Sequence, residues 1–594
     1  MTLPTHQTCS SLEGNESQGN AKKVRFSYSF SAKIKNWLKM TDRRIPIFCC
    51  GGMEVCFKSV ICWLNHGYDR EEKRLKRTVS GGVLLIVLMS ILALTLSVPS
   101  VKATGTIYIR ADGSIDPPTA PIQRNGTVYT FTANITSDAY AGIEVQRNII
   151  TIDGNGYTLK GSNVVGSVGI NVTGISNVKI KNITIKTFYV GIFLCISSGD
   201  GISGNNIIAN GGSGIAFFIS SNSSISGNSI TMNTWYGIYL DASSNYNNIS
   251  GNNVAANEQE GILLSDSSSY NTISGNKITN NNCGIDLDSS SSYNTVSGNN
   301  ITDNGDGVDL WSSSTFNTIS GNNIVANNYD GIVLDSSSNN AFFHNYIVGN
   351  PVQVNSQGSI SSWDDGYPSG GNYWGDYTTR YPGALEIDAS RIWNTPYVID
   401  ASNRDHYPLL GPWTSGGENV TVTPASGVSL TFANVISEGI TTVNEAQSGP
   451  SVPAGCKIEG RYFDIKTTAT LSGSVTIRII YNDTSMTLWE EETLRLMRWN
   501  ATSQQWQDIT THVDTVNNVI YGETNHLSMF GITAGPVPGD INRDGVVDIS
   551  DAAQIGIWWQ KAAPPAPANV DITGDGYIDI SDAAVLGINW QKHT

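Results

Sequence analysis

Charged side chains are scarce in this chain, since Asp, Glu, Lys and Arg make up only 14% of its 594 residues. Lys and Arg are nearly absent between residues 203 and 341, where neutral Asn, Ser, Thr and Gly provide the polar surface. This composition is typical of β-rich extracellular proteins rather than helical cytosolic enzymes. The net charge is −16, and residues 1–79 hold 14 Lys and Arg against 7 Asp and Glu, which leaves −23 for the remainder. So acidic a body repels phosphate backbones, and nucleic acid is not expected as a partner.

Cysteines and long apolar runs are also few. Five of the eight cysteines lie within residues 1–79, and the other three are too widely spaced to define a disulfide framework. One long apolar run, Gly81–Val98, follows the basic stretch Lys73–Arg77 and precedes small residues up to Ala103. This order predicts export through residues 80–103, as a cleaved signal peptide or an uncleaved anchor, the only expected membrane contact. Because the basic extension 1–79 is too long for a signal, we interpret it as a misassigned start.

From residue 202 the chain repeats a short unit every 23 or 24 residues. Each copy opens on a variant of Ile-Ser-Gly-Asn, continues to Gly-Ile-x-Leu and ends in a Ser-rich corner; copies begin at Ile202, Ile225, Ile249, Ile273, Val296 and Ile319. One unit cannot bury its own apolar side chains, whereas stacked units bury a continuous column. In Gly-Ile-x-Leu, alternation turns Ile and Leu inward and the intervening residue outward. The repeat predicts a mainly β fold, with a β-solenoid of roughly ten coils over residues 104–350.

Two asparagines recur at constant positions of the unit, which predicts two ladders along the solenoid. One set follows the repeated Gly (Asn205, Asn228, Asn252, Asn276, Asn299 and Asn322), and the other lies five residues later (Asn210, Asn233, Asn257, Asn281, Asn304 and Asn327). At a corner, Asn tolerates a left-handed backbone and its amide can bond the same group one coil away. We interpret both ladders as structural rather than as ligand-binding.

The repeat, together with the later segments Gly371–Tyr377 and Asp405–Pro408, resembles the NosD-type family of right-handed parallel β-helices, whose architecture is like that of pectate lyases. The resemblance covers about residues 105–412. It implies a right-handed β-helix closed at its C-terminal end by a cap, which we place at residues 351–413. A shared architecture of this kind predicts the fold and says little about the chemistry.

Three carboxylates are candidate catalytic residues, because enzymes of this architecture place such groups on the outward face of one sheet. Asp286 and Asp309 occupy the same outward position of consecutive units, about 4.8 Å apart, with Asp288 about 6.6 Å along the strand. These separations are near those of paired-carboxylate glycosidases. Unpaired carboxylates so close require a cation such as Ca²⁺ or a proton. The simplest interpretation is still an acidic edge with its carboxylates spread into water, since the basic partners of lyase and polygalacturonase sites are missing.

Aromatic residues in the same units offer a second feature of this face. Tyr239 and Trp311 are candidate ligand-binding residues, with Trp235, Tyr236 and Tyr329 nearby in the sequence pattern. Their rings could stack on sugar rings or simply pack the corners of the coils. The second interpretation is the simpler one for isolated surface aromatics.

Beyond residue 413 the 23-residue period stops and alternating segments such as Ser474–Ile480 take over. Such segments with turn residues between them predict a β-sandwich over residues 414–535. No catalytic constellation occurs there, so the sandwich is interpreted as a spacer or an interaction module.

A pattern of oxygen-bearing residues occurs twice in residues 536–594, with the copies 31 residues apart. Ligands at positions 1, 3, 5, 7, 9 and 12 of a loop surround Ca²⁺, position 7 through its main-chain carbonyl, and a Gly at position 6 permits the sharp turn. The expected ligands are Asp540, Asn542, Asp544, Val546, Asp548 and Asp551 in the first loop, and Asp571, Thr573, Asp575, Tyr577, Asp579 and Asp582 in the second. We therefore expect two Ca²⁺ ions in this small α-helical module.

The loops end in Asp rather than Glu, and a single helix is expected after each, so the module resembles type I dockerin domains. The resemblance implies a cohesin-like partner that contacts the helices near Ile549, Ser550, Ile580 and Ser581. It also implies a weaker second calcium site, because Thr573 replaces the usual Asn or Asp.

Together these features predict an exported cell-surface or secreted protein that binds a polysaccharide or other glycan through its β-helix and docks to a cohesin-like partner. Two alternatives remain open. One is a dockerin-bearing polysaccharide lyase or glycoside hydrolase acting through Asp286, Asp288 and Asp309, and the other is a structural component of the cell envelope.

Overall fold

The computed structural model describes residues 101–592, apart from residues 104, 485, 487–489, 492, 536, 564–565 and 568. The basic extension and residues 80–100 of the predicted signal or anchor lie outside the described residues, whereas its last three residues, 101–103, form a strand of the solenoid. Within the described residues, no helix is long and apolar enough to cross a membrane. Cys195, Cys283 and Cys456 are unpaired, in line with their wide spacing.

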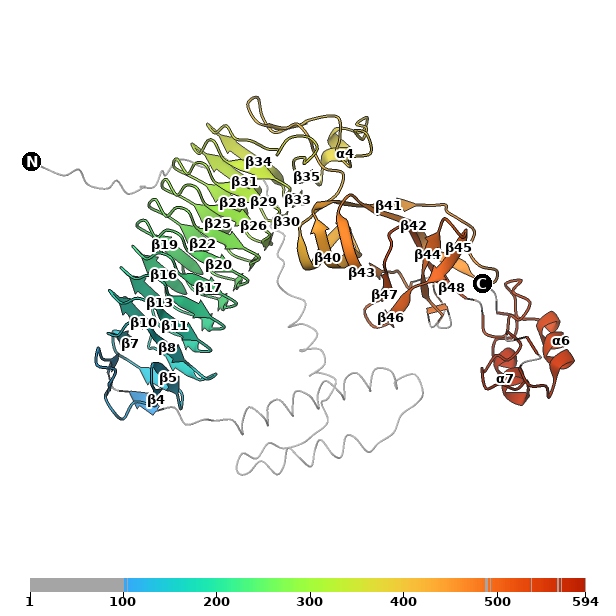
Figure 1. Cartoon of the computed structure of the whole chain (residues 1–594), viewed down its shortest axis with the longest axis horizontal. Coiled ribbons are helices and arrows are strands. Elements are labelled where there is room, and N and C mark those ends of the chain that lie inside the picture. The colour runs from blue at the N-terminus through green and yellow to red at the C-terminus, as the bar shows by residue number, and fades with distance from the viewer. Residues whose placement is uncertain are drawn as a thin grey trace, which may run out of the picture. The chain divides into compact units, whose positions relative to one another are not determined.

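Residues 101–374 form a parallel β-solenoid of about eleven coils, stacked one on the next (Figure 1). Each regular coil gives one short strand to each of three sheets, here called A, B and C. Sheet A contains β1 (Val101–Ala103), β6 (Ile135–Ser137), β9 (Thr158–Lys160), β12 (Thr184–Lys186), β15 (Asn206–Ile208), β18 (Ser229–Thr231), β21 (Asn253–Ala255), β24 (Lys277–Thr279), β27 (Asn300–Thr302), β30 (Asn323–Val325), β33 (Tyr346–Val348) and β35 (Tyr373–Trp374).

The other two sheets run beside it along the same axis. Sheet B contains β3 (Ile115–Asp116), β2 (Ile107–Ile109), β7 (Ala141–Val145), β10 (Val168–Thr173), β13 (Val190–Cys195), β16 (Ile215–Phe218), β19 (Ile238–Asp241), β22 (Glu260–Leu264), β25 (Cys283–Leu287), β28 (Asp306–Leu310), β31 (Asp330–Asp335) and β34 (Val352–Gln357). Sheet C contains β32 (Ala341–Phe343), β29 (Thr318–Ser320), β26 (Thr295–Ser297), β23 (Thr272–Ser274), β20 (Asn248–Ser250), β17 (Ser224–Ser226), β14 (Gly201–Ser203), β11 (Val178–Lys181), β8 (Ile150–Asp153), β5 (Val128–Phe131) and β4 (Ile122–Asn125).

The repeat places equivalent residues directly over one another. Ile225 of β17 pairs with Ile202 in the preceding coil and with Ile249 in the following one. Inward side chains are fully buried, as Ile285 and Leu287 of β25 show, both with 0% exposure. Each such side chain contributes about 1.5–3 kcal/mol of apolar burial. The predicted alternation within Gly-Ile-x-Leu is therefore confirmed, and it leaves the intervening residue on the outer face.

Both predicted Asn ladders are present. Asn276 is representative: its Nδ2 donates to Asn299 Oδ1 and to the carbonyl of Ile249, both at 2.9 Å, and its Oδ1 accepts from the main-chain and side-chain nitrogens of Asn252, also at 2.9 Å. A third ladder, not foreseen, arises from the Tyr-Asn-Thr element and contains Asn247, Asn271, Asn294, Asn317 and Asn340. Each of these ladder amides is thus bonded to a neighbouring coil.

The expected left-handed backbone at these ladder asparagines is wrong. It lies one residue earlier, at Gly275 (φ 62°) and Asn280 (φ 58°) for the ladder residues Asn276 and Asn281. The preceding residue makes the turn, because the ladder amide itself must point into the coil to reach its partners.

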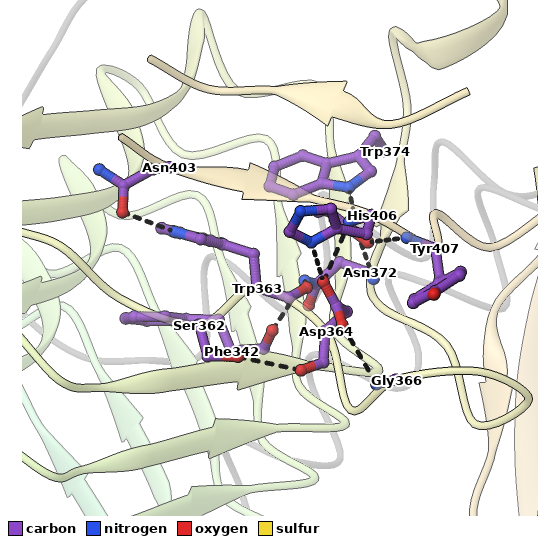
Figure 2. Close-up of polar contacts among 11 residues, drawn as sticks. Phe342, Ser362, Trp363, Asp364, Gly366, Asn372, Trp374, Asn403, His406 and Tyr407 are labelled. Carbon is purple, nitrogen blue, oxygen red and sulfur yellow. Dashed lines mark hydrogen bonds and ion pairs between the residues drawn. The ribbon is translucent and has the colours of Figure 1, made fainter. Parts of the chain in front are cut away.

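Aromatic rings cover the apolar column at its C-terminal end. Phe342, Trp363, Trp374 and Tyr397 stack in succession, with centroid separations of 4.4, 6.0 and 4.0 Å, and all four are buried. Figure 2 shows the polar contacts around them; Trp363 Nε1 donates to Asn403 Oδ1 at 3.2 Å. The rings shield the last coil from solvent.

A buried carboxylate accepts hydrogen bonds from three residues at this end of the solenoid. Asp405 lies in β37 (Arg404–Asp405), which pairs with β36 (Tyr397–Val398), and it accepts from the N–H of Asn372 at 2.7 Å, from Trp374 Nε1 at 2.9 Å and from the N–H of Tyr407 at 3.0 Å. A short helix, α4 (Tyr377–Arg380), lies between β35 and β36 in the sequence.

Two antiparallel sheets follow as a β-sandwich. One contains β38 (Trp413–Thr414), β41 (Gly439–Ala446), β42 (Lys457–Thr467), β48 (Met529–Ala534), β44 (Arg495–Asn500) and β45 (Gln505–Asp508), and the other β39 (Gly417–Ala425), β40 (Val428–Ser437), β43 (Thr470–Ile480), β47 (Val519–Thr524) and β46 (Thr510–Asp514). Their inner faces share a core that includes Leu430, Phe432, Ile477 and Phe530. The predicted fold class is confirmed here.

The last module contains two helices, α6 (Ile549–Trp558) and α7 (Ile580–Ile588). Each begins with a capping box, in which Asp548 or Asp579 caps the helix and the Asp three residues later bonds back to the cap. The module's core is small, with Val547, Ile555 and Leu586 among its few buried apolar side chains.

Candidate functional site

The outer face of sheet B holds the carboxyl pair that the repeat predicted. Asp286 of β25 and Asp309 of β28 are Cα partners in parallel register. Leu263 precedes them and Val333 follows them in the same outward row. Adjacent strands place the two carboxyl groups about 4.8 Å apart along the axis.

The expectation that these carboxylates spread into water is wrong. Asp309 is only 7% exposed, and one oxygen of each residue, Oδ1, is buried without a hydrogen-bond partner in the described part of the chain. The physical reason is the row itself, because Leu263 and Val333 are 8% and 5% exposed and close it at both ends. Nothing in a single repeat unit reveals this burial.

Burial raises the pKa of Asp309 to about 7, repulsion from Asp306 adds to the effect, and hydrogen bonds from Cys283 and Trp311 oppose it. For Asp286, burial and then repulsion from Asp309 raise the pKa well above its usual range. Two carboxyls this close titrate as a pair, so we assign the pair at least one proton at neutral pH.

The third predicted carboxylate lies just beyond the strand end, close enough for its repulsion to help raise the pKa of Asp286. Asp288 follows the end of β25, and its Oδ2 accepts from Ser289 Oγ at 2.9 Å. Glu260 also lies close by, on the preceding strand of sheet B, and burial and repulsion from Asp288 raise its pKa. Sequence reasoning missed Glu260 and Cys283, because the position before the repeated Gly changes residue type from coil to coil.

Aromatic side chains occupy the neighbouring rungs of the same face. Tyr239 of β19 pairs with Leu263, which pairs in turn with Asp286, so the three share one row. Ring centroids lie 4.9 Å apart for Tyr236 and Tyr239, and 6.2 Å for Trp235 and Tyr236. Trp235 is 45% exposed. These rings form a continuous cluster rather than isolated corner residues.

Trp311, the second aromatic candidate, follows the end of β28 and is 37% exposed. Trp311 lies close enough to Asp309 to lower the pKa of that carboxyl group, so it stands at the edge of the carboxyl pair. Tyr329, at 66% exposure, lies just before β31.

In the first predicted calcium loop, main-chain groups hold the carboxylates. Asp540 Oδ2 accepts from the N–H of Gly545 at 3.0 Å, and Asp551 Oδ1 accepts from the N–H groups of Ile541 and Asn542 at 2.7 and 3.0 Å. Burial and repulsion from Asp551 raise the pKa of Asp540. Gly545, at φ 95°, makes the sharp turn that the loop pattern requires.

Main-chain groups hold the carboxylates of the second loop in a similar way, but one carboxylate oxygen has no hydrogen-bond partner. Asp571 Oδ2 accepts from the N–H of Gly576 at 2.9 Å, whereas Asp571 Oδ1 is buried without a partner. Thr573 Oγ1 donates to Asp582 Oδ1 at 3.2 Å. Among the described residues, no group of three or more His, Cys, Asp and Glu is already gathered to hold a metal ion. An orphaned carboxylate oxygen in an all-oxygen set nevertheless fits a hard cation such as Ca²⁺.

Both module helices expose apolar side chains at equivalent positions. The predicted partner-binding residues Ile549 and Ile580 are 73% and 71% exposed. Ser550 and Ser581 donate through N and Oγ to the capping carboxylates Asp548 and Asp579. Sequence reasoning missed four further exposed apolar residues, because helical periodicity does not say which face is covered: Ile557, Trp559, Ile588 and Trp590.

Two family models match the chain. The model described as a right handed beta helix region matches residues 122–278 and 233–367, and the dockerin type I domain model matches residues 538–587. The solenoid is therefore a right-handed β-helix, and the C-terminal module is a dockerin type I domain. Dockerin type I domains generally bind calcium.

Several solved structures are similar to the chain. They include the periplasmic alginate epimerase AlgG (18% identity, 44% of this chain and 72% of that one, TM-score 0.27), the Dettilon tailspike protein (15%, 73% and 86%, 0.35) and the pectate lyase Pel9A (15%, 38% and 72%, 0.26). No curated protein matches the chain.

Proposed function

We propose that this protein is an exported glycan-binding protein whose dockerin domain attaches it to a cohesin-like partner. The observation that carries the proposal is the composition of sheet B, where an aromatic cluster and a row of carboxyl groups share one outward face. Aromatic rings stack on sugars and carboxyl groups bond their hydroxyls, which is how many small-ligand sites combine apolar and polar contacts.

Glycan binding is tested by measuring the retention of the full chain in gels that contain a panel of soluble polysaccharides. Replacing Trp235 and Tyr239 together by Ala should weaken retention at least tenfold, because both rings are lost from the cluster. Tyr270→Ala is the matched control, since Tyr270 is also exposed but immediately precedes sheet C. Unchanged retention of the double variant would contradict a role for sheet B.

Docking is supported by the paired exposure of Ile549 and Ile580 on the dockerin helices. Two Ca²⁺ ions, one in each loop, would hold the helices in place through the oxygen ligands of Asp540 to Asp551 and Asp571 to Asp582. Pull-down with type I cohesin domains should succeed in calcium and fail in chelator. Ile549→Asp with Ile580→Asp should abolish it, whereas Val516→Asp, at an 88% exposed position of the sandwich, should not.

A second candidate function is glycoside hydrolysis at the same face. It is favoured by one observation, the pKa of about 7 at Asp309 beside a second carboxyl, which suits a general acid. A reducing-end assay over the same polysaccharides tests it. New ends that disappear in Asp309→Asn and persist in Asp303→Asn would establish the enzyme, and no release by the wild-type chain would exclude it for those substrates.

A further inference from the structure

The outward face of sheet B becomes strongly acidic along the axis. Its strands from β19 to β31 carry seven carboxyl side chains: Asp241, Glu260, Asp286, Asp306, Asp309, Asp330 and Asp335. Lys277 is the single Lys or Arg between residues 187 and 379, and it lies in β24 of sheet A. No side chain of opposite charge therefore comes from this stretch to balance the face.

The two buried carboxyl groups at its centre have unused hydrogen-bonding capacity. Oδ1 of Asp286 and Oδ1 of Asp309 are buried without partners in the described structure. Folded proteins leave few buried polar atoms unsatisfied, so two in adjacent rungs of one outward row single out this carboxyl pair as one that the chain itself does not satisfy. Asp405, at the end of the same solenoid, shows the usual outcome, with three donors around its carboxylate.

The row also has the dimensions of an extended ligand. Tyr239, Leu263, Asp286 and Asp309 follow one another through consecutive register pairs. Three strand spacings separate the first from the last, about 14 Å along the axis. An oligosaccharide can lie along this row with one ring on the aromatic cluster and its hydroxyl groups over the carboxyl pair.

We infer that sheet B takes an uncharged glycan whose hydroxyl groups bond the carboxyl groups of Asp286 and Asp309. The inference rests on the proposed glycan-binding function and specifies the charge of the ligand. A polyuronate would bring carboxylates against an acidic sheet that no Lys or Arg of residues 187–379 balances, since Lys277 lies in sheet A. A protonated carboxyl group is both a donor and an acceptor, as is a hydroxyl group, and the raised pKa values leave the pair with at least one proton at neutral pH.

A cationic ligand requires the opposite protonation state of the carboxyl pair. An ammonium group or a metal ion needs ionised carboxylates, and ionising this pair meets the burial and mutual repulsion that raise the two pKa values. A neutral ligand leaves the protons where they are. An Asn side chain also offers a donor and an acceptor, so it can replace Asp for a neutral ligand but not for a cation.

The experiment measures retention of the full chain in gels containing neutral polysaccharides (xyloglucan, mixed-linkage glucan, mannan), polygalacturonate, alginate or chitosan, at one calcium concentration. We expect at least one neutral polymer to be bound tenfold more tightly than any charged one. Asp309→Asn should keep that affinity within about threefold, and Asp309→Leu should lose tenfold or more. Asp303→Leu is the control, because Asp303 is exposed and follows the sheet A strand β27.

Three outcomes overturn the inference in different ways. Tighter binding of polygalacturonate, alginate or chitosan than of any neutral polymer removes the neutral ligand and leaves glycan binding intact. A large loss in Asp309→Asn shows that ionised carboxylate is required, which contradicts the proposed contact. Retention on no polymer removes the proposed function as well. Tyr239→Ala, which leaves the carboxyl row unaltered, should weaken neutral binding even if the Leu variant folds poorly.

Discussion

The β-helix and the dockerin domain are both built from repeats in which a polar residue returns at a constant offset, yet the two sets of residues do different things. In the β-helix the repeated residue is Asn, and Asn276 is bonded through both ends of its amide to the coils on either side. In the dockerin domain the repeated residue is Asp, and Asp571 keeps one buried oxygen without a partner. Whether the repeated polar groups all have hydrogen-bond partners thus distinguishes a structural repeat from a ligand-binding one. The repetition itself does not distinguish them.

The carboxyl pair of sheet B lies in the β-helix but resembles the dockerin loop, because its oxygens are not all hydrogen-bonded. Asp286 and Asp309 recur over only two coils, whereas the ladder through Asn276 continues to Asn345 and Asn372. Their Oδ1 atoms are unpartnered, like that of Asp571. This similarity is why we interpret the pair as part of a ligand site and the ladders as structure.

Removing calcium should have the largest effect, and it should be confined to the dockerin domain. Two ions at a thousandfold excess over their Kd would stabilise the domain by roughly 8 kcal/mol, more than its small apolar core can replace. Hydrogen exchange in chelator should show loss of amide protection in α6 and α7 and unchanged protection in sheets A, B and C. Amide protection that persists in α6 and α7 without calcium, or that is lost in sheets A, B and C, would contradict this difference between the two regions.

Asn276→Ala should be the next largest effect, because the main-chain N–H of Asn252 loses its bond to Asn276 Oδ1. The side-chain amides of Asn252 and Asn299 and the carbonyl of Ile249 each lose one bond as well. A buried group that loses its partner costs about 1–3 kcal/mol, so we expect a loss of roughly 3 kcal/mol in the free energy of unfolding of the β-helix. Urea denaturation measures it. The matched control is Asn323→Ala in β30, an exposed residue of sheet A with one side-chain hydrogen bond to Asn300, which should change the value by less than about 0.5 kcal/mol. Equal effects at both positions would show that the ladder contributes nothing special.

Most of the β-helix can be predicted from the repeat alone, and particular residues show why the rest of the site cannot. The pairing of Asp286 with Asp309 is predictable because one period separates them. Their burial is not, since it depends on Leu263 and Val333, which other coils supply at a position where residue type varies. Likewise the loop pattern locates Asp571, but its orphaned oxygen depends on how the main-chain N–H groups fold around it.

Asp309→Asn should have a smaller effect that depends on pH. The pKa of Asp309 is raised to about 7 in the folded chain, against about 3.9 when unfolded. Between these values the folded state binds more protons, so the free energy of unfolding of the wild type falls as pH rises from 4 to 7 and then levels.

The Asn variant lacks this slope. It should match the wild type near pH 4 and be roughly 1–3 kcal/mol more stable at pH 8, where the wild type holds ionised carboxylates in a buried row. Urea denaturation at both pH values decides it. A wild type that gains stability between pH 4 and 7 relative to the variant would mean that a partner stabilises Asp309 as an anion. Its Oδ1 would then not be unpartnered like that of Asp571.

The smallest expected effect compares the two calcium loops with each other. Thr573 offers one hydroxyl, which donates to Asp582, at the position where the first loop has the amide of Asn542, whose Oδ1 accepts from the N–H of Asp544. Because the donors at each loop position tune calcium affinity, Thr573→Asn should tighten the second site by about 1 kcal/mol, or roughly fivefold, and Asn542→Thr should weaken the first site by a similar factor. Calorimetric titration of the full chain resolves the two sites, and the two substitutions act as controls for each other. If both substitutions change the affinity of the same site, or neither changes either affinity, the difference between the loops does not arise at this position. It must then come from the main-chain groups that hold Asp540 and Asp571.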